Sequence, residues 1–173
     1  MTCVLGIDPG SQITGYGVVE VNGPRFHYFD SGCIRTRVEQ SLAERLRTIF
    51  EGVGAVIERH HPEQMAIEIV FMHRHADAAL KLGQARGVAI CAAANAGLTV
   101  HEYAPRAIKQ AVVGYGAAAK GQVQHMVRAL LKLPEAPLAD AADALAVALC
   151  HAHTLQTQAR LPVAAQLLTR RRL

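Results

Sequence analysis

Residues 4–21 read VLGIDPGSQITGYGVVEV, and this stretch decides the fold. The run from Cys3 to Ile7 is apolar and typical of a buried strand, which a Pro-Gly pair brings to an end. Thr14 to Val21 has the composition of a second strand. Two short strands joined by a tight turn are therefore expected, with Asp8 at the end of the first.

A third strand follows from the turn after Val21. Asn22-Gly23-Pro24 supplies that turn, and the Asn-Gly pair is a strong hairpin signal because both central residues of a type I′ turn need positive φ. Arg25 to Ile34 is then the returning strand. The chain is therefore predicted to begin with three antiparallel strands.

The later hydrophobic patterns alternate between helices and strands. Ser41 and Glu44 form a capping box, and apolar residues at helical spacing continue to about Arg59. Gln64 to Phe71 is apolar on both faces apart from Glu68, as expected for a strand inside a parallel sheet. The remaining segments are predicted as a helix, a strand and three helices: Ala76–Ala96, Leu98–Tyr103, Pro105–Val113, Ala118–Leu133 and Leu138–His153.

This order predicts an α/β fold with a mixed five-stranded sheet, three antiparallel strands and then parallel ones, flanked by helices. The chain has 173 residues, 51% of them hydrophobic, so it can bury a full core without disulfides. Residues 1–153 are expected to form a single domain and residues 154–173 a loosely ordered basic tail.

The charge is distributed unevenly along the chain. Residues 1–103 carry nine basic and eleven acidic side chains, whereas residues 104–173 carry nine basic and three acidic ones. The second part is therefore the candidate anion-binding part. The four cysteines form no CxxC pair, which favours reduced thiols and a cytoplasmic location. The N-terminus does not resemble a signal peptide, and no apolar run is long enough to span a membrane.

Four acidic residues stand in otherwise apolar segments. Asp8 ends the first strand, Glu68 interrupts the fourth, and Asp140 and Asp143 are three residues apart on the last helix. Residues at this helical spacing share one face. If the two strands are neighbours and the helix packs over them, the carboxylates converge, and a cluster of oxygen ligands without His or Cys selects Mg²⁺ or Mn²⁺.

Each carboxylate also has a simpler interpretation. Asp8 before Pro-Gly could be a turn residue, and Asp140 could be a helix N-terminal charge favoured by the helix dipole. Glu68 and Asp143 are harder to explain in that way, because their neighbours are apolar and carry no basic residue. The spacing therefore favours a metal cluster without excluding separate structural roles.

Two glycines on one predicted helix and two histidines on another need an interpretation of their own. Gly83 and Gly87 lower helix stability, so close approach by another backbone is expected, either in the sheet or in a dimer. The histidines His151 and His153 are interpreted as favourable charges at a helix C-terminus, because no second pair of metal ligands stands at the spacing of a zinc site.

The chain also resembles a known family in motifs that extend over residues 4 to about 153. They are GIDPGSQITGYGVV, SGCIRT, AIEIVFM, ADAALKLGQARGVAI, AIKQAVVG, AAKGQVQHMV and ADAADALAVA. They occur in the same order in the RuvC-type Holliday junction resolvases, which have the ribonuclease H-like fold. The resemblance implies that Asp8, Glu68, Asp140 and Asp143 form the acidic cluster of a Mg²⁺-dependent endonuclease, with two ions per site and Mn²⁺ as a possible substitute.

The resemblance further implies particular contacts with DNA. Lys109 and Lys120 match basic residues near the scissile strand, and Phe71 matches an aromatic residue that contacts bases near the crossover. Arg74 lies in the same loop, where an exposed aromatic beside a basic residue suits base stacking next to a backbone clamp. Three positions, Ile69, Ala119 and Gly121, depart from the commonest family pattern but leave every carboxylate in place.

The implied function is a homodimer that nicks two opposing strands of a four-way DNA junction and leaves 5′-phosphate and 3′-hydroxyl ends. Its implied partners are the RuvA and RuvB branch-migration proteins. Three alternatives are weighed: a related ribonuclease H-like nuclease acting on RNA, a non-catalytic junction-binding module and an actin-like phosphotransferase. All four carboxylates are present, which disfavours the second, and the chain is too short for the second domain that the third requires.

Overall fold

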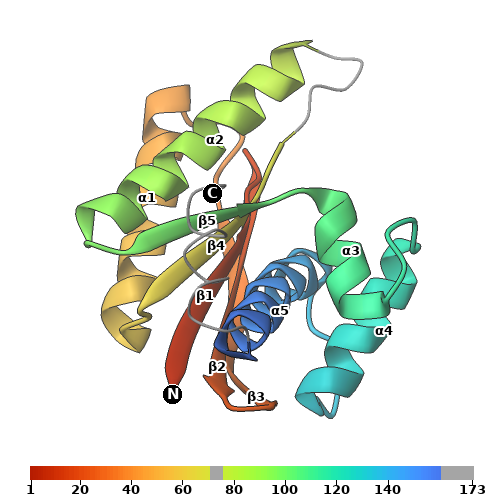
Figure 1. Ribbon diagram of the computed structural model, residues 1–173. Coiled ribbons are helices and arrows are strands. Elements are labelled where there is room, and N and C mark those ends of the chain that lie inside the picture. Colours follow the sequence, from red (N-terminus) through yellow and green to blue (C-terminus); the bar gives the residue numbers. More distant parts are fainter. Residues whose placement is uncertain (71–75, 161–173) are drawn as a thin grey trace.

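The computed structural model describes residues 1–70 and 76–160 (Figure 1). Ten helices and strands lie in these two ranges. In chain order they are β1 (Thr2–Asp8), β2 (Ile13–Asn22), β3 (Arg25–Arg35), α1 (Leu42–His60), β4 (Gln64–Glu68), α2 (Ala76–Asn95), β5 (Thr99–Tyr103), α3 (Pro105–Val113), α4 (Lys120–Leu131) and α5 (Ala139–Arg160).

The strands form a single mixed sheet in the order β3-β2-β1-β4-β5. The pairs β1–β2 and β2–β3 are antiparallel, whereas β1–β4 and β4–β5 are parallel. The predicted architecture, three antiparallel strands and then parallel ones, is therefore confirmed.

Helices cover both faces of the sheet, as Figure 1 shows. On one face, alternate residues of the strands pack with α1 and α2, among them Leu5, Val18 and Ile67. On the other face, the intervening residues, such as Val4 and Ala66, pack with α5, and α3 and α4 pack against α5. The alternation of the strands thus divides the core into two layers, and the acidic residues lie in the layer that contains α5.

Unusually close packing brings α5 onto the sheet. A Cβ atom at Gly6 would lie 2.2 Å from the Ala144 carbonyl oxygen, and one at Gly15 would lie 2.0 Å from the Asp140 carbonyl oxygen. Any larger residue would push the helix away. The glycines of the opening motif therefore let the backbone that carries Asp140 approach the strands directly.

Helix α1 begins as predicted. The Glu44 backbone N–H donates to Ser41 Oγ at 3.3 Å, and the Ser41 backbone N–H donates to Glu44 Oε2 at 2.8 Å. Both halves of the capping box are present, so two of the free N–H groups at the helix start are satisfied.

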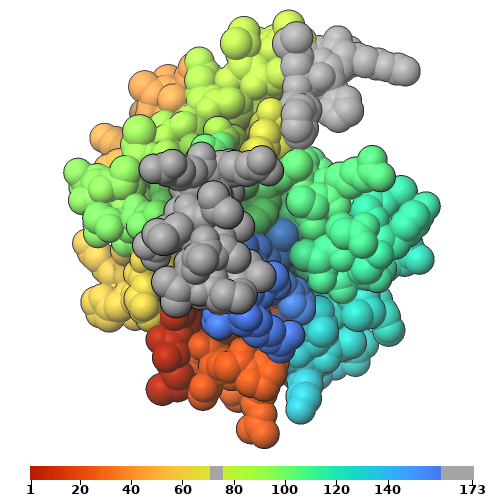
Figure 2. Space-filling model, viewed as in Figure 1, coloured from red at the N-terminus to blue at the C-terminus, as the bar shows by residue number. Residues whose placement is uncertain are grey.

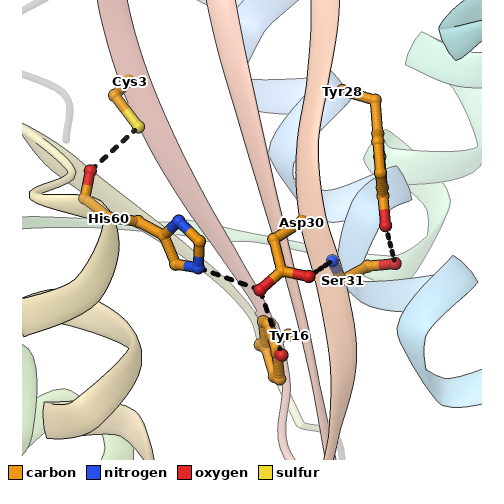
Figure 3. A network of polar contacts seen from close by, with 6 residues as sticks. All are labelled: Cys3, Tyr16, Tyr28, Asp30, Ser31 and His60. Carbon is orange, nitrogen blue, oxygen red and sulfur yellow. Dashed lines mark hydrogen bonds and ion pairs between the residues drawn. The ribbon is translucent and has the colours of Figure 1, made fainter.

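The polar network of Figure 3 attaches the outer strand β3 to the end of α1. Asp30 Oδ2 accepts hydrogen bonds from His60 Nε2 at 2.9 Å and from the Tyr16 hydroxyl at 3.3 Å, and Oδ1 accepts from the Ser31 N–H at 2.8 Å. The Cys3 thiol donates to the His60 carbonyl at 3.8 Å. The contacts lie on the face opposite α5, so this network stabilises the sheet away from the acidic residues.

The hairpin turn differs from the prediction. Asn22 pairs with Arg25, so the central residues of the turn are Gly23 and Pro24. Gly23 has a φ of 57°, but a proline ring cannot adopt positive φ. The predicted Asn-Gly type I′ turn is therefore wrong, although the hairpin that it indicated is present.

Two elements end elsewhere than predicted. Strand β4 ends at Glu68 rather than Phe71, because its partner β5 ends at Tyr103 and the chain then enters α3. Helix α5 continues to Arg160 instead of ending at His153, and Gln156 in this extension donates to the Gly23 carbonyl at 2.7 Å. The expectation of a loose tail from residue 154 is therefore wrong for residues 154–160, and residues 161–173 lie outside the described ranges.

Two further observations concern the thiols and the helices. Cys3, Cys33, Cys91 and Cys150 are all free, as their spacing predicts. None of the helices in the described part of the chain has both the length and the hydropathy that a membrane span needs.

Candidate active site

The carboxylates meet at the carboxyl-terminal ends of the two central parallel strands. Ile7 of β1 pairs with Ile67 of β4, so Asp8 and Glu68, the last residues of these strands, are neighbours. The carboxyl-terminal ends of both strands lie at the top of the sheet in Figure 1. Asp140 and Asp143 come from the first turns of α5. This part of the helix packs against Gly15 of β2, which pairs with Asp8 at the same end of the sheet. The strands and the helix that carry the four acidic residues therefore come together at one end of the sheet.

The electrostatics of Asp8 show how closely the four groups interact. The pKa of Asp8 is raised to about 7, first by burial and then by the negative charges of Glu68, Asp143 and Asp140, with Lys120 acting in the opposite direction. The pKa of Glu68 is also raised, first by burial and then by Asp143. In the absence of a cation, burial and neighbouring negative charge therefore favour the protonated forms of Asp8 and Glu68.

Two lysines supply positive charge beside the cluster. Lys120 Nζ forms an ion pair with Asp143 Oδ2 at 2.5 Å, and this contact raises the pKa of the lysine. Lys109 lowers the pKa of Glu68 by its charge. An open cavity of about 180 Å³ is lined by both lysines together with Glu68 and Asp143. Glu68 also lines a second cavity, of about 200 Å³, together with Asp8. The site is therefore a partly neutralised acidic cleft with room for a phosphate.

The donor chemistry of the cluster fits a hard divalent cation, since it consists of carboxylate oxygens that are partly removed from water. Within residues 1–70 and 76–160, however, no three acidic, His or Cys side chains are arranged as ligands of one ion. Asp143 is instead paired with the ammonium group of Lys120.

Other side chains hold the backbone around the carboxylates and were not singled out from the sequence. Arg86 of α2 donates from Nε to the Glu68 carbonyl at 3.0 Å and pairs with Glu102. Thr14, which is 1% exposed, donates to the Gly10 carbonyl at 2.9 Å in the loop after Asp8. The signal for Arg86 was weak, since an isolated arginine on a helix of small residues is usually a solvated charge.

Two of the positions that depart from the family pattern, Ala119 and Ile69, make backbone hydrogen bonds in the structure. Ala119 has no side-chain oxygen to cap α4, but its backbone N–H donates to Gln122 Oε1 at 2.8 Å. The Ile69 N–H donates to the Tyr103 carbonyl at 2.8 Å, which extends the contact between β4 and β5 by one residue. Phe71 and Arg74 lie outside the described residues, so their predicted contacts with DNA stay predictions.

A mixed sheet of this order, with carboxylates from two central strands and an overlying helix, defines a nuclease of the ribonuclease H-like class. The family model described as "Crossover junction endodeoxyribonuclease RuvC" matches residues 4–151. The chain therefore belongs to the RuvC family of crossover junction endodeoxyribonucleases, the family that its motifs resemble.

Individual relatives agree with this assignment. The RuvC of Tolumonas auensis is 61% identical over 93% of this chain and 92% of its own length. That of Marinobacter nauticus is 60% identical over 93% of this chain and 91% of its own length. Among solved structures, T. thermophilus RuvC in complex with a Holliday junction substrate is 40% identical and has a TM-score of 0.86, with 91% of this chain and 96% of that chain covered.

More distant structures share the fold alone. The yeast mitochondrial Holliday junction resolvase Ydc2 is 13% identical, with a TM-score of 0.62 over 98% of this chain and 86% of that chain. The similarity of the fold thus extends well beyond the range in which the sequence remains similar.

Proposed function

We propose that this enzyme resolves four-way DNA junctions with Mg²⁺ held by Asp8, Glu68, Asp140 and Asp143. The observation that carries the proposal is the arrangement of the carboxylates: the pairing of Ile7 with Ile67 places Asp8 beside Glu68, and the start of α5 with Asp140 packs against Gly15 at the same end of the sheet. The raised pKa of Asp8 agrees with negative charge gathered in a partly buried site. A divalent ion would remove that excess, and Mn²⁺ would substitute for Mg²⁺ because both prefer oxygen ligands.

The bound ions would supply a water of lowered pKa and stabilise the charge on the attacking and leaving oxygens. The protein's part begins with Asp8, which must lose its proton before it can bind an ion. Lys120 would then leave Asp143 for the phosphate, since the same ammonium group cannot serve both and the phosphate carries the developing charge. Lys109, which lines the same cavity, would hold the phosphodiester in place.

The second strand of the junction would be cut by a second copy of the chain. Helix α2 supports this proposal, because a Cβ atom at Gly83 or Gly87 would meet nothing within 4 Å, and Leu80 on the same helix is 68% exposed. Packing against the sheet, one of the two explanations for these glycines, is therefore excluded. Figure 2 shows α2 on the outer surface of the molecule, where the small residues would let a second helix approach.

The remaining contacts extend the proposal to DNA and to other proteins. Phe71 would stack on an unpaired base near the crossover, with Arg74 on the adjacent backbone. We infer that the enzyme acts in the cytoplasm on junctions moved by the RuvA and RuvB branch-migration proteins, as the family membership suggests.

A cleavage assay tests the proposal directly. Protein with Mg²⁺ should convert a synthetic four-way junction into two nicked duplexes that ligase can seal, while linear duplex and RNA–DNA hybrid stay intact. Asp8→Asn should abolish cleavage and retain junction binding, because it removes a metal ligand without adding charge. Equal activity of Asp8→Asn would remove the carboxylates from the mechanism, and preferred cleavage of the hybrid would favour a ribonuclease instead.

A further inference from the structure

His151 lies in the middle of α5 and contacts two strands of the parallel part of the sheet. It is 1% exposed, and its imidazole lies 4.2 Å from that of His101 in a stacked arrangement. Its Nε2 lies 2.6 Å from Gln64 Oε1, at the start of β4, and its Nδ1 lies 2.7 Å from the Tyr103 hydroxyl, at the end of β5. The expectation of a favourable charge at a helix end is therefore wrong for this residue.

The hydrogen bonds define the chemical state of the ring. Gln64 Oε1 can only accept, so Nε2 carries the proton, and the Tyr103 hydroxyl donates to the bare Nδ1. The imidazole is therefore neutral, in agreement with burial, which lowers its pKa to about 3. Both nitrogens have a partner, so the buried ring is a fully satisfied polar contact.

The strands that His151 contacts also carry the acidic site. Gln64 is the first residue of β4 and Glu68 is the last. Tyr103 accepts the Ile69 N–H through its carbonyl, directly after Glu68. Asp140 and Asp143 lie at the start of the helix that contains His151. One side chain therefore connects the helix that carries two carboxylates with the strand that carries a third.

The rest of the interface between α5 and the sheet is close-packed and made largely of small residues. Six of the eleven buried residues of α5 are alanines; Ala144 and Ala148 lie against Gly6 of β1, and the Leu145 side chain packs on Gly17 of β2. Small side chains interlock less deeply than large ones, so a directional contact can add to these contacts in setting the position of the helix. A directional hydrogen bond can define that position, as buried polar groups do for register in coiled coils.

We propose that His151 is a positioning residue that sets the axial and rotational place of α5 on β4 and β5, so that Asp140 and Asp143 face Asp8 and Glu68. The proposal rests on the proposed metal-dependent function of that cluster. His151 itself touches neither the carboxylates nor the substrate cavities that the described residues line. Its effect is therefore expected on metal affinity rather than on the chemistry at saturating metal.

A variant with apolar replacements separates positioning from stability. His151→Leu, Tyr103→Phe and Gln64→Met together replace the ring and both of its hydrogen-bond partners. Thr154, which also interacts with the Tyr103 hydroxyl, keeps its bond to the Cys150 carbonyl, so the urea midpoint should stay close to that of the wild type. The affinity for Mn²⁺, measured on the intact protein from the electron paramagnetic resonance signal of free Mn²⁺, should fall about tenfold. Cleavage should show the same shift in half-maximal Mn²⁺ concentration and recover at saturation.

His153→Gln is the matched control, because His153 lies on the same helix but contacts Phe26 of β3 instead of β4 or β5. It should leave Mn²⁺ affinity unchanged. Tyr103→Phe alone removes the hydroxyl that donates to Nδ1 and should weaken Mn²⁺ binding in the same direction, which keeps the test valid if the triple variant does not fold. In metal-free protein, ¹⁵N spectra should show the Nε2-protonated neutral tautomer from pH 5 to 8.

The outcomes are distinguishable. If the wild type binds Mn²⁺ and the folded triple variant binds it equally well, the positioning role is overturned while the proposed function stands. If the triple variant does not fold, unchanged Mn²⁺ affinity of the Tyr103→Phe variant overturns the positioning role in the same way. A wild-type protein that neither binds Mn²⁺ nor cleaves junctions would overturn both proposals.

Discussion

At the scale of single residues, Asp8 is both the last residue of a buried strand and a carboxylate of the candidate site. The residue ends a buried strand, and its carboxyl has a pKa of about 7 because burial and three neighbouring carboxylates disfavour its charge. A usual aspartate pKa applies in the unfolded chain. The folded protein therefore binds more protons than the unfolded chain between about pH 4 and pH 7, and the free energy of unfolding falls as pH rises through that window.

The raised pKa of Asp8 predicts that Asp8→Asn stabilises the metal-free protein. In EDTA at pH 8 the variant should unfold at a higher urea concentration, by about 2–4 kcal/mol, because the amide removes a charge that burial disfavours. Near pH 4 the two proteins should be almost equally stable, since Asp8 is then protonated. Equal stability at pH 8 would show that the carboxylate is not under electrostatic strain.

The ion pair of Lys120 with Asp143 leads to a second prediction, namely that the lysine competes with the proposed metal ion for this carboxylate. Lys120→Met should raise the affinity of the DNA-free protein for Mn²⁺, because the ion pair at 2.5 Å is removed and the cluster becomes more negative. Junction cleavage should nevertheless fall, on the order of 10²-fold, since the phosphate loses a cation. Lys81→Met, which breaks an exposed ion pair with Asp77 on α2, is the control for both measurements. If Lys120→Met loses both Mn²⁺ affinity and cleavage activity, the proposed competition between Lys120 and the metal ion for Asp143 is contradicted.

At the scale of the elements, the contact between α5 and the sheet determines whether the site exists. The sheet supplies Asp8 and Glu68 in neighbouring strands, but Asp140 and Asp143 reach them only because glycines allow the helix backbone to approach. Gly15 is the clearest case, since its Cα faces the carbonyl group of Asp140 itself. Close packing and the chemistry of the site are therefore coupled at this position.

Gly15→Ala should accordingly damage both stability and metal binding. The added Cβ would lie 2.0 Å from the Asp140 carbonyl oxygen, so α5 must shift, with a loss of about 1–3 kcal/mol in the free energy of unfolding. Mn²⁺ affinity should fall as well. Gly54→Ala in α1, where a Cβ would meet nothing within 4 Å, should instead stabilise the protein by up to about 1 kcal/mol. A harmless Gly15→Ala would show that the helix can be displaced without consequence for the site.

At the scale of the whole molecule, the described residues contain one acidic cluster, whereas symmetric resolution of a junction needs two cuts. The surface of α2 is where the second subunit is expected, because a Cβ atom at Gly83 or Gly87 would meet no other atom of residues 1–70 and 76–160 within 4 Å. These glycines lower the stability of the single subunit, which is consistent with a contact made by another molecule.

Gly87→Leu tests this assembly. The variant should fold with unchanged or greater subunit stability, since leucine favours the helix and has free space around it. Sedimentation equilibrium should show a weaker dimer, by at least about tenfold in dissociation constant, because the new side chain separates the two helices. Cleavage should then yield junctions nicked once rather than twice. A dimer as strong as the wild type would locate the interface elsewhere.

The sequence by itself determined those features that depend on neighbouring residues. The capping box at Ser41, the strand with an interrupting Glu68 and the helical spacing of Asp140 and Asp143 were all predicted, because hydrogen bonding and hydrophobic periodicity within one element are local properties. The acidic residues stood out for the same reason, as charges in apolar segments. Family membership followed from the order of these local motifs along the chain.

Only the tertiary structure decided the features that depend on distances between elements. The pairing of Ile7 with Ile67, the ion pair of Lys120 with Asp143 and the hydrogen bonds of His151 each join residues far apart in the chain. The end of α5 was mispredicted because contacts such as that of Gln156 with Gly23 extend the helix beyond its local pattern. Packing selects one arrangement from many that the local patterns allow, and the acidic site is a consequence of that selection.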